Sequence, residues 1–100
     1  MNTDDFEKAF EEQVERCREV LVNKAREYAT EDRLHNFKVA AALQGISPEA
    51  ALAGFLAKHI VSIFDMTPTP KSHSRAQWDE KITDALNYLF LLNAIINEES

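Results

Sequence analysis

Apolar residues recur every three or four positions through long stretches of this chain, and very little interrupts them. In the first stretch the recurring positions are Phe6, Phe10, Val14, Cys17, Leu21 and Tyr28. This spacing places side chains on one stripe of an α-helix. Two glycines and three prolines in 100 residues leave few positions that oppose helix formation. The pattern predicts an all-α fold, a compact bundle of about four helices.

Residues typical of helix ends set the expected bounds. We expect helices over residues 4–29, 33–44, 48–66 and 75–97, with a proline-containing loop over residues 67–74. Thr3, Ser47 and Ser74 are the expected N-caps of the first, third and fourth helices. Gly45 is the expected end of the second helix, because glycine accepts a left-handed backbone. The length fits a single domain over residues 1–100.

The expected core is small. We expect the second helix to bury Leu34, Phe37, Ala41 and Leu43, and we interpret Cys17 as a small core residue. A domain of this size buries a limited fraction of its surface. One apolar face of the bundle is therefore expected to meet further copies of the chain, as a homo-oligomer of two or more subunits.

Charge and composition exclude several classes of protein. The net charge is −6 and the basic residues are scattered, so direct binding to nucleic acid is not expected. No apolar stretch approaches the 18 residues of a membrane span, and the acidic N-terminus lacks the basic start of a signal peptide. With one cysteine no internal disulfide can form, which fits a reducing cytoplasm.

Polar residues on otherwise apolar helices are the candidate site, because burying them without partners costs free energy. Four groups share a helix face or a helix start: Lys24 and Tyr28; His35 and Asn36; Lys58, Ser62 and Asp65; and Glu80, Asp84, Asn87 and Tyr88. Carboxylates bind hard divalent metal ions, and lysines bind phosphates as point charges. If these faces converge, they predict a pocket for a nucleotide carried with Mg²⁺.

Several of these residues also have ordinary interpretations. Glu80 fits the exposed first turns of the fourth helix, and Lys24 fits a solvated face. His59, next to Lys58, fits a histidine satisfied within the fold. The acidic stripe of Glu12, Glu15 and Glu19 is expected to be solvated.

Two short motifs resemble a known family. Residues 24–28 read K-A-R-E-Y, similar to a K-x-x-[DE]-Y element, and residues 84–88 read D-A-L-N-Y, similar to a D-x-x-N-Y helix. Lys58 resembles a lysine that lies between these elements. The stretch from Val14 to Ile95 thus resembles the DUF1599-type nucleotide-modification-associated domains of phage and prophage proteins. Its layout also resembles the wider all-α nucleoside triphosphate pyrophosphatases, the MazG-like and dimeric dUTPase-like group.

The resemblance implies an oligomeric protein that handles a nucleotide in the cytoplasm of a bacterial host. In the pyrophosphatases, E-x-x-E and E-x-x-D carboxylates on two helices hold Mg²⁺, which polarises the phosphoanhydride. Asp84 matches the last aspartate of this pattern, Lys81 stands at the preceding glutamate, and Glu80 is displaced by one position. The implied metal ligands and catalytic residues are Asp84 and Glu80. The implied nucleotide contacts are Lys24, Tyr28, His35, Asn36, Lys58, Ser62, Asn87 and Tyr88.

Three functions remain open from the sequence. The first is a MazG-like, Mg²⁺-dependent pyrophosphohydrolase that converts a nucleoside triphosphate to the monophosphate. The second is a phage-type accessory protein that binds a nucleotide or nucleotide-derived signal without turnover, which Lys81 at a metal-ligand position favours. The third is an inhibitor that binds another protein through the acidic face from Glu11 to Glu19.

Overall fold

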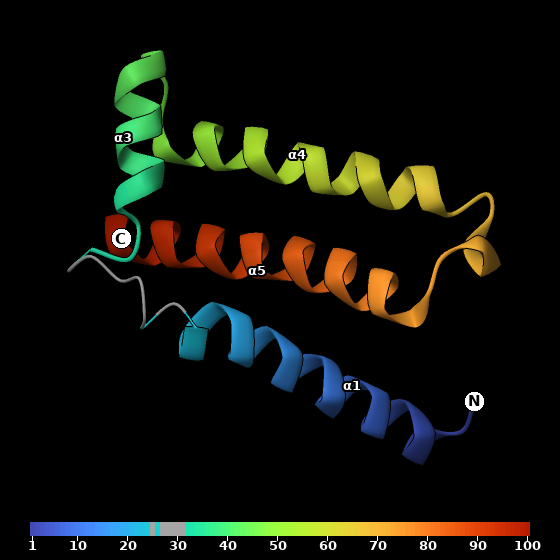
Figure 1. The fold of residues 1–100 in the computed structure, drawn as a ribbon. Coiled ribbons are helices and arrows are strands. Elements are labelled where there is room, and N and C mark those ends of the chain that lie inside the picture. Colours follow the sequence, from blue (N-terminus) through green and yellow to red (C-terminus); the bar gives the residue numbers. More distant parts are fainter. Residues whose placement is uncertain (25, 27–31) are drawn as a thin grey trace.

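The computed structural model describes residues 1–24, 26 and 32–100 (Figure 1). Within this part the chain is all-helical, with four α-helices and no strand. The elements in order are α1 (Thr3–Arg18), the π-helix η1 (Glu19–Lys24), α3 (His35–Gln44), α4 (Pro48–Met66), the 3₁₀ turn η2 (Pro70–Ser72) and α5 (Arg75–Glu99).

Helix α5 is the centre of the arrangement. Figure 1 shows α4 and α5 side by side and antiparallel, joined by the loop that contains η2. Helix α1 runs along the other side of α5, in the same direction, and diverges from it toward the N-terminus. The short α3 crosses the end of this layer near the C-terminus, where the chain turns by 101° into α4.

Local hydrogen bonds explain where the helices begin and end. Ser47 Oγ accepts the Ala50 N–H at 3.1 Å, and Ser74 forms a capping box with Gln77, so both predicted caps are confirmed. Gly45 ends α3 with φ +68°, as expected. These starts and stops follow from chemistry that is local in the chain.

The first cap prediction is wrong by one residue. Asn2, not Thr3, caps α1, because its Oδ1 accepts the Asp5 N–H at 2.8 Å. An asparagine oxygen serves the same free N–H groups as a threonine hydroxyl, so the helix begins one position earlier.

The start of α3 and the end of α5 differ slightly from the predicted bounds, and the structure describes only part of the first predicted helix. The first helix continues beyond Arg18 as the π-helix η1 to Lys24, and residues 25 and 27–29 of its predicted range lie outside the described residues. Helix α3 starts at His35 rather than at residue 33, because the Asp32 carboxylate accepts the Leu34 N–H and closes a turn there. Helix α4 has the predicted bounds, and α5 extends to Glu99.

The core lies where α3, α4 and α5 meet. Leu52 is fully buried there, with Leu34, Phe37 and Ile95 around it. Cys17 is also buried, as expected. Leu43 was expected in this core but is 82% exposed, because it lies two residues, about 200° of helix rotation, from the buried Ala41.

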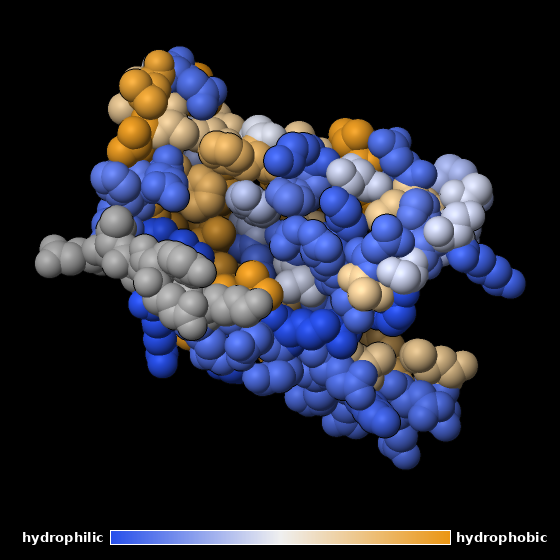
Figure 2. All heavy atoms as spheres, viewed as in Figure 1, coloured by the Kyte–Doolittle hydropathy of each residue, from blue (hydrophilic) through white to orange (hydrophobic). Residues whose placement is uncertain are grey.

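The surface is uneven in polarity. On the face drawn in Figure 2, hydrophobic side chains gather around α3 and the start of α4, whereas hydrophilic side chains dominate the seam between α1 and α5. No single helix in the described ranges is both long and apolar enough to cross a membrane, and α3 with α4 passes that test only as a bent pair.

Candidate functional site

A groove lies between α1, the first residues of η1, and α5. Its volume is about 270 Å³, and we call it the acidic groove; its lining residues are Arg16, Glu19, Val20, Asp79, Glu80, Thr83 and Asp84. The α5 residues come from two successive helical turns, so their side chains share one flank of that helix. Four of the seven lining residues are carboxylates, which makes this groove a candidate site for a cation or a cation-bearing ligand.

Two of these carboxylates are already engaged. Asp79 Oδ1 lies 2.8 Å from Arg75 Nη2 and 3.6 Å from Arg16 Nη2. Glu19 accepts a hydrogen bond from Asn23 Nδ2 at 2.9 Å. The two arginines offset the charge of Asp79, whereas the Asn23 amide leaves the charge of Glu19 in place.

Glu80 and Asp84 differ from Asp79 in their partners. Among the described residues neither carboxylate pairs with a lysine or arginine. Asp84 Oδ2 lies 3.8 Å from His59 Nδ1 on α4, a contact that is an ion pair only when the histidine is protonated. The Asp84 side chain is 33% exposed, so its charge is partly removed from water. Two neighbouring anionic groups therefore remain available to an external cation.

Two buried polar residues follow the groove along α5. Thr83 Oγ1 accepts a hydrogen bond from Gln13 Nε2 at 2.9 Å, which ties α1 to α5. Asn87, one turn further, is 6% exposed, and in the described chain neither its Oδ1 nor its Nδ2 has a hydrogen-bond partner. An unpaired buried amide costs about 1–3 kcal/mol for each unsatisfied group. Asn87 thus carries hydrogen-bonding capacity that the described part of the chain does not use.

An aromatic cluster lies on the α4 side of α5. Tyr88 stacks with Phe55 at a centroid distance of 6.5 Å and an interplanar angle of 13°, and it meets Phe37 edge-on. The His59 ring lies 4.9 Å from the Tyr88 ring. His59 therefore contacts both Tyr88 and Asp84, and the two α5 residues are joined through α4.

A second polar cavity, of about 410 Å³, lies between the end of α4, the loop and the start of α5. We call it the polar pocket; its lining residues are Ser62, Asp65, Met66, His73, Gln77, Glu80 and Lys81. Glu80 lines both cavities and so stands on the ridge between them. Lys81 lines the polar pocket and is not among the residues of the acidic groove.

The predicted site residues are brought together in part. Glu80 and Asp84 share the acidic groove, and Ser62 joins Glu80 in the polar pocket. Asn87 and Tyr88 lie on the next turn of α5. These five residues thus follow α5 and the adjoining part of α4.

Other predicted residues lie elsewhere. Lys58 is exposed on α4, and its neighbour His59 is the residue that faces Asp84. His35 and Asn36 are exposed in the first turn of α3. The Lys24 side chain and Tyr28 lie outside the described part, so their predicted roles stay predictions.

Sequence reasoning missed the contribution of α1 to the groove. Arg16 and Glu19 lie beside the apolar stripe of that helix, and Glu19 is exposed, as expected, while it also lines the groove. The spacing from Gln13 through Arg16 to Val20 places these residues on one flank. The direction in which α1 packs against α5 decides that this flank faces the groove.

The donor chemistry of the acidic groove fits Mg²⁺. This ion prefers oxygen ligands and is ordinarily held by one or two carboxylates together with waters and substrate phosphates. In the described ranges, no three His, Cys, Asp or Glu side chains are arranged to hold one metal ion by themselves. Holding Mg²⁺ with Glu80 and Asp84 would therefore leave the remaining ligand positions to water and substrate.

The fold defines an all-α protein with a carboxylate-lined groove beside its central helix. No protein-family model, no curated protein and no solved structure matches this chain.

Proposed function

We propose that this protein is a MazG-like nucleoside triphosphate pyrophosphohydrolase that binds its Mg²⁺-bearing substrate in the acidic groove. One observation carries the proposal. Glu80 and Asp84, one helical turn apart on α5, line the same groove as Glu19 of η1, and in the described chain no lysine or arginine pairs with either α5 carboxylate. An uncompensated pair of this kind attracts a divalent cation.

The residues of the groove have different proposed roles, according to their chemistry. Glu80 and Asp84 are the proposed Mg²⁺ ligands, and the ion when bound neutralises phosphate charge and polarises the phosphoanhydride. Arg16 is the cation of the groove, and its buried Nε has no hydrogen-bond partner among the described residues. We assign it to a phosphate oxygen, which a guanidinium binds with directional hydrogen bonds.

The base and sugar are assigned to the next turn of α5. Asn87 has a free amide donor and acceptor, the pair of groups that recognises the edge of a nucleobase. The Tyr88 ring, next to Asn87 in the chain, packs on the α4 side of α5 against Phe55. His59, held between Tyr88 and Asp84, is proposed to orient the Asp84 carboxylate.

The position of Lys81 bears on the choice between turnover and binding. In the sequence, a lysine three residues before Asp84 favours binding without cleavage. Lys81 lines the polar pocket, however, and Glu80 takes the place beside Asp84 in the acidic groove. Because Glu80 and Asp84 are four residues apart, they share a helix face without Lys81 between them. This arrangement supports hydrolysis over binding alone.

The test is pyrophosphate release from a panel of ribo- and deoxyribonucleoside triphosphates with Mg²⁺. We expect release from at least one nucleotide. Asp84→Asn and Glu80→Gln should each lower the rate on the order of a hundredfold or more, the usual effect of losing one electrostatic contact to the transition state. Glu12→Gln is the matched control, because this glutamate is exposed on α1 and does not line the groove.

Three outcomes separate the alternatives. Silence across the panel, with no nucleotide bound in calorimetry, would exclude both nucleotide functions and leave the protein-binding inhibitor. Binding that depends on Asp84 without pyrophosphate release would instead establish the accessory protein that holds a nucleotide. Full activity in Asp84→Asn would remove the acidic groove from the mechanism.

A further inference from the structure

A chain of hydrogen bonds joins α1 to α5 beside the acidic groove. Arg16 Nη2 donates to Gln13 Oε1 at 3.1 Å, and Gln13 Nε2 donates to Thr83 Oγ1 at 2.9 Å. The same Nε2 also donates to the Cys17 sulfur at 3.4 Å. Gln13 thus uses both ends of its amide inside the fold, and it is not among the residues that line the groove.

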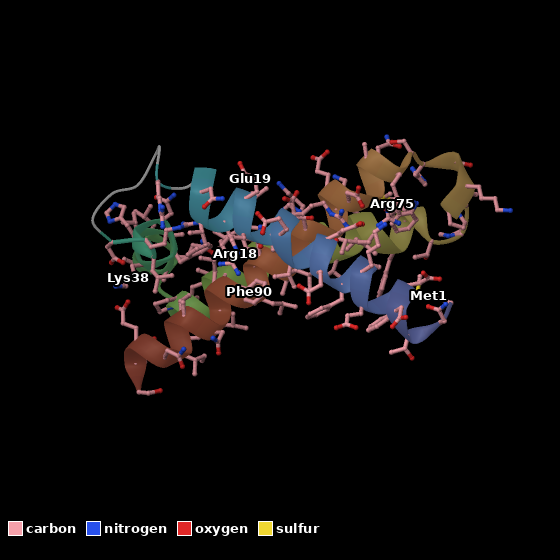
Figure 3. All side chains as sticks on the ribbon, turned by 90° about the horizontal axis from the view of Figure 1, so that it is seen from below. Met1, Arg18, Glu19, Lys38, Arg75 and Phe90 are labelled. Atoms are coloured by element: carbon pink, nitrogen blue, oxygen red, sulfur yellow. The ribbon has the colours of Figure 1, made fainter. Side chains whose placement is uncertain are left out.

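These hydrogen bonds lie where the two helices cross. Figure 3 shows α1 crossing α5, with Glu19 and Arg18 directed to opposite sides of α1. Arg16 and Thr83, at the two ends of the hydrogen-bond chain, both line the acidic groove together with Glu19. A change at Gln13 therefore reaches the groove through both of its partners.

The arginine fixes the direction of these hydrogen bonds. A guanidinium has only donors, so the end of the Gln13 amide that faces Arg16 must be the oxygen. The amide nitrogen, which only donates, then faces Thr83, and the Thr83 oxygen must accept. The opposite orientation of the amide would bring two donors together at Arg16. The polarity therefore runs from Arg16 through Gln13 to Thr83.

This polarity leaves the hydrogen of the Thr83 hydroxyl without an acceptor in the described part of the chain. Ser62 and Thr67 donate their hydroxyl hydrogens to carbonyls of α4, whereas the hydrogen bond found at the Thr83 hydroxyl is the one that it accepts from Gln13. Thr83 is 4% exposed and lines the acidic groove. An acceptor for its hydrogen therefore has to enter by way of that groove.

A second donor beside the groove is also unpaired. Arg16 Nε is buried, and in the described ranges it has no hydrogen-bond partner. Arg16 and Thr83 thus add unused donors to a cavity whose carboxylates are acceptors. Donors select a ligand atom that only accepts, and beside a cation held by carboxylates such an atom is a phosphoryl oxygen.

We propose that the Thr83 hydroxyl donates a hydrogen bond to a phosphoryl oxygen of the substrate, and that Gln13 is the positioning residue that keeps this hydrogen free. The identity of the substrate rests on the proposed function. The hydrogen bond itself needs only a phosphate chain that is bound with Mg²⁺, whether or not the protein cleaves it. Gln13 acts on the ligand through Thr83 and Arg16, because it does not line the groove itself.

The test is calorimetric binding of inorganic tripolyphosphate with Mg²⁺ to the full chain. This probe presents phosphoryl oxygens without a base or sugar, and we expect the unmodified protein to bind it. Thr83→Val should raise the dissociation constant about tenfold or more, the effect of losing one hydrogen bond to a charged acceptor. Thr83→Ser keeps the hydroxyl and should bind nearly as tightly as the unmodified protein. Thr67→Val, which removes a hydroxyl at the exposed end of α4, is the matched control.

Gln13→Glu tests the polarity of the hydrogen bonds. A carboxylate of nearly the same shape still accepts from Arg16, but it offers Thr83 an acceptor in place of a donor, so the Thr83 hydrogen turns away from the ligand. The dissociation constant should rise about tenfold or more in the unmodified chain, and much less in the Thr83→Val background, which has no hydrogen to redirect. The added negative charge alone would weaken binding equally in both backgrounds.

Four results would overturn the proposal. They are no binding of tripolyphosphate to the unmodified protein, full affinity in Thr83→Val, a Thr83→Ser variant as weak as Thr83→Val with unchanged helical circular dichroism, and an equal effect of Gln13→Glu in both backgrounds. Binding that depends on Thr83 in a protein that releases no pyrophosphate would support this hydrogen bond and end the proposed hydrolysis. Pyrophosphate release that Thr83→Val leaves unchanged would do the reverse.

Discussion

Replacing Asn87 by leucine should make the protein more stable. The Asn87 side chain is 94% buried, and among the described residues neither of its two polar groups has a hydrogen-bond partner. Leucine has the same number of side-chain heavy atoms, is somewhat bulkier, and carries no group that needs a partner. A buried polar residue that the fold does not satisfy is expected where binding, rather than folding, uses it.

The size of the effect follows from the two unsatisfied groups. Each costs about 1–3 kcal/mol when buried without a partner. Fitting the leucine side chain into the packed seam costs about 1–3 kcal/mol of strain, which offsets part of this gain. We therefore expect Asn87→Leu to raise the free energy of unfolding by about 2 kcal/mol, and the midpoint temperature by about 8–16 °C for a domain of this size.

The assay is urea unfolding followed by helical circular dichroism, without ligand. Thr83→Val is the matched control, one turn earlier on α5, because its hydroxyl accepts the Gln13 hydrogen bond. Losing that bond should lower the unfolding free energy by about 1 kcal/mol. If Asn87→Leu is destabilising as well, the Asn87 amide has partners in solution and the reasoning is refuted. Under the proposed function, the same variant should be more stable and yet bind nucleotide more weakly.

Two further predictions concern backbone and charge. Gly45→Ala should cost about 1–2 kcal/mol because φ there is +68°, whereas Gly54→Ala, inside α4 with open space around the added Cβ, should gain about 0.5–1 kcal/mol; urea unfolding of the two variants compares them directly. Lys38 binds Asp32 at 2.7 Å and also Glu98, and the Asp32 hydrogen bond lowers the pKa of Asp32 below 3.8 and raises the pKa of Lys38 above 10.5. Asp32 stabilises the folded state fully above its ordinary pKa, and this stabilisation is lost as the pH falls through its lowered pKa. Lys38 stabilises the folded state fully below 10.5, and this stabilisation is lost as the pH rises through its raised pKa. Lys38→Met should therefore lower the urea midpoint at neutral pH, with a difference from the unmodified protein that shrinks toward both extremes; a constant difference across the pH range would contradict this.

The local features of the fold were predictable because local chemistry decides them. Ser47 and Ser74 cap helices through hydrogen bonds to residues three positions away, and Gly45 ends one through its own backbone freedom. The error at Asn2 has the same origin, since two neighbouring residues can each cap and the sequence does not rank them. Leu43 was misplaced because the short α3 buries a narrow face, whose direction depends on α4 and α5.

The sequence named individual residues of the candidate site, but it did not show how they are arranged in space. Spacing on α5 put Glu80, Asp84 and Asn87 on related faces; in the structure the first two line one groove, and Asn87 is buried on the next turn. The sequence predicted one pocket for Lys58 and Asp84, whereas the structure leaves Lys58 exposed and places His59 3.8 Å from Asp84. A rotation of α4 by one residue, about 100°, separates these two outcomes, and helical periodicity does not determine how far a helix is rotated.

The sequence by itself determined that this chain is helical and where most of its helices begin and end. It also showed that polar residues lie on otherwise apolar helices. These properties depend on contacts within about four residues, which are written directly in the order of the side chains. The tertiary structure alone decided that Glu19 lines one groove with the carboxylates of α5 and that Arg18, Arg26 and Arg33 line two adjoining cavities at Phe90. Those arrangements depend on the direction in which α1 crosses α5, and that direction is set by packing between residues as distant in the chain as Gln13 and Thr83.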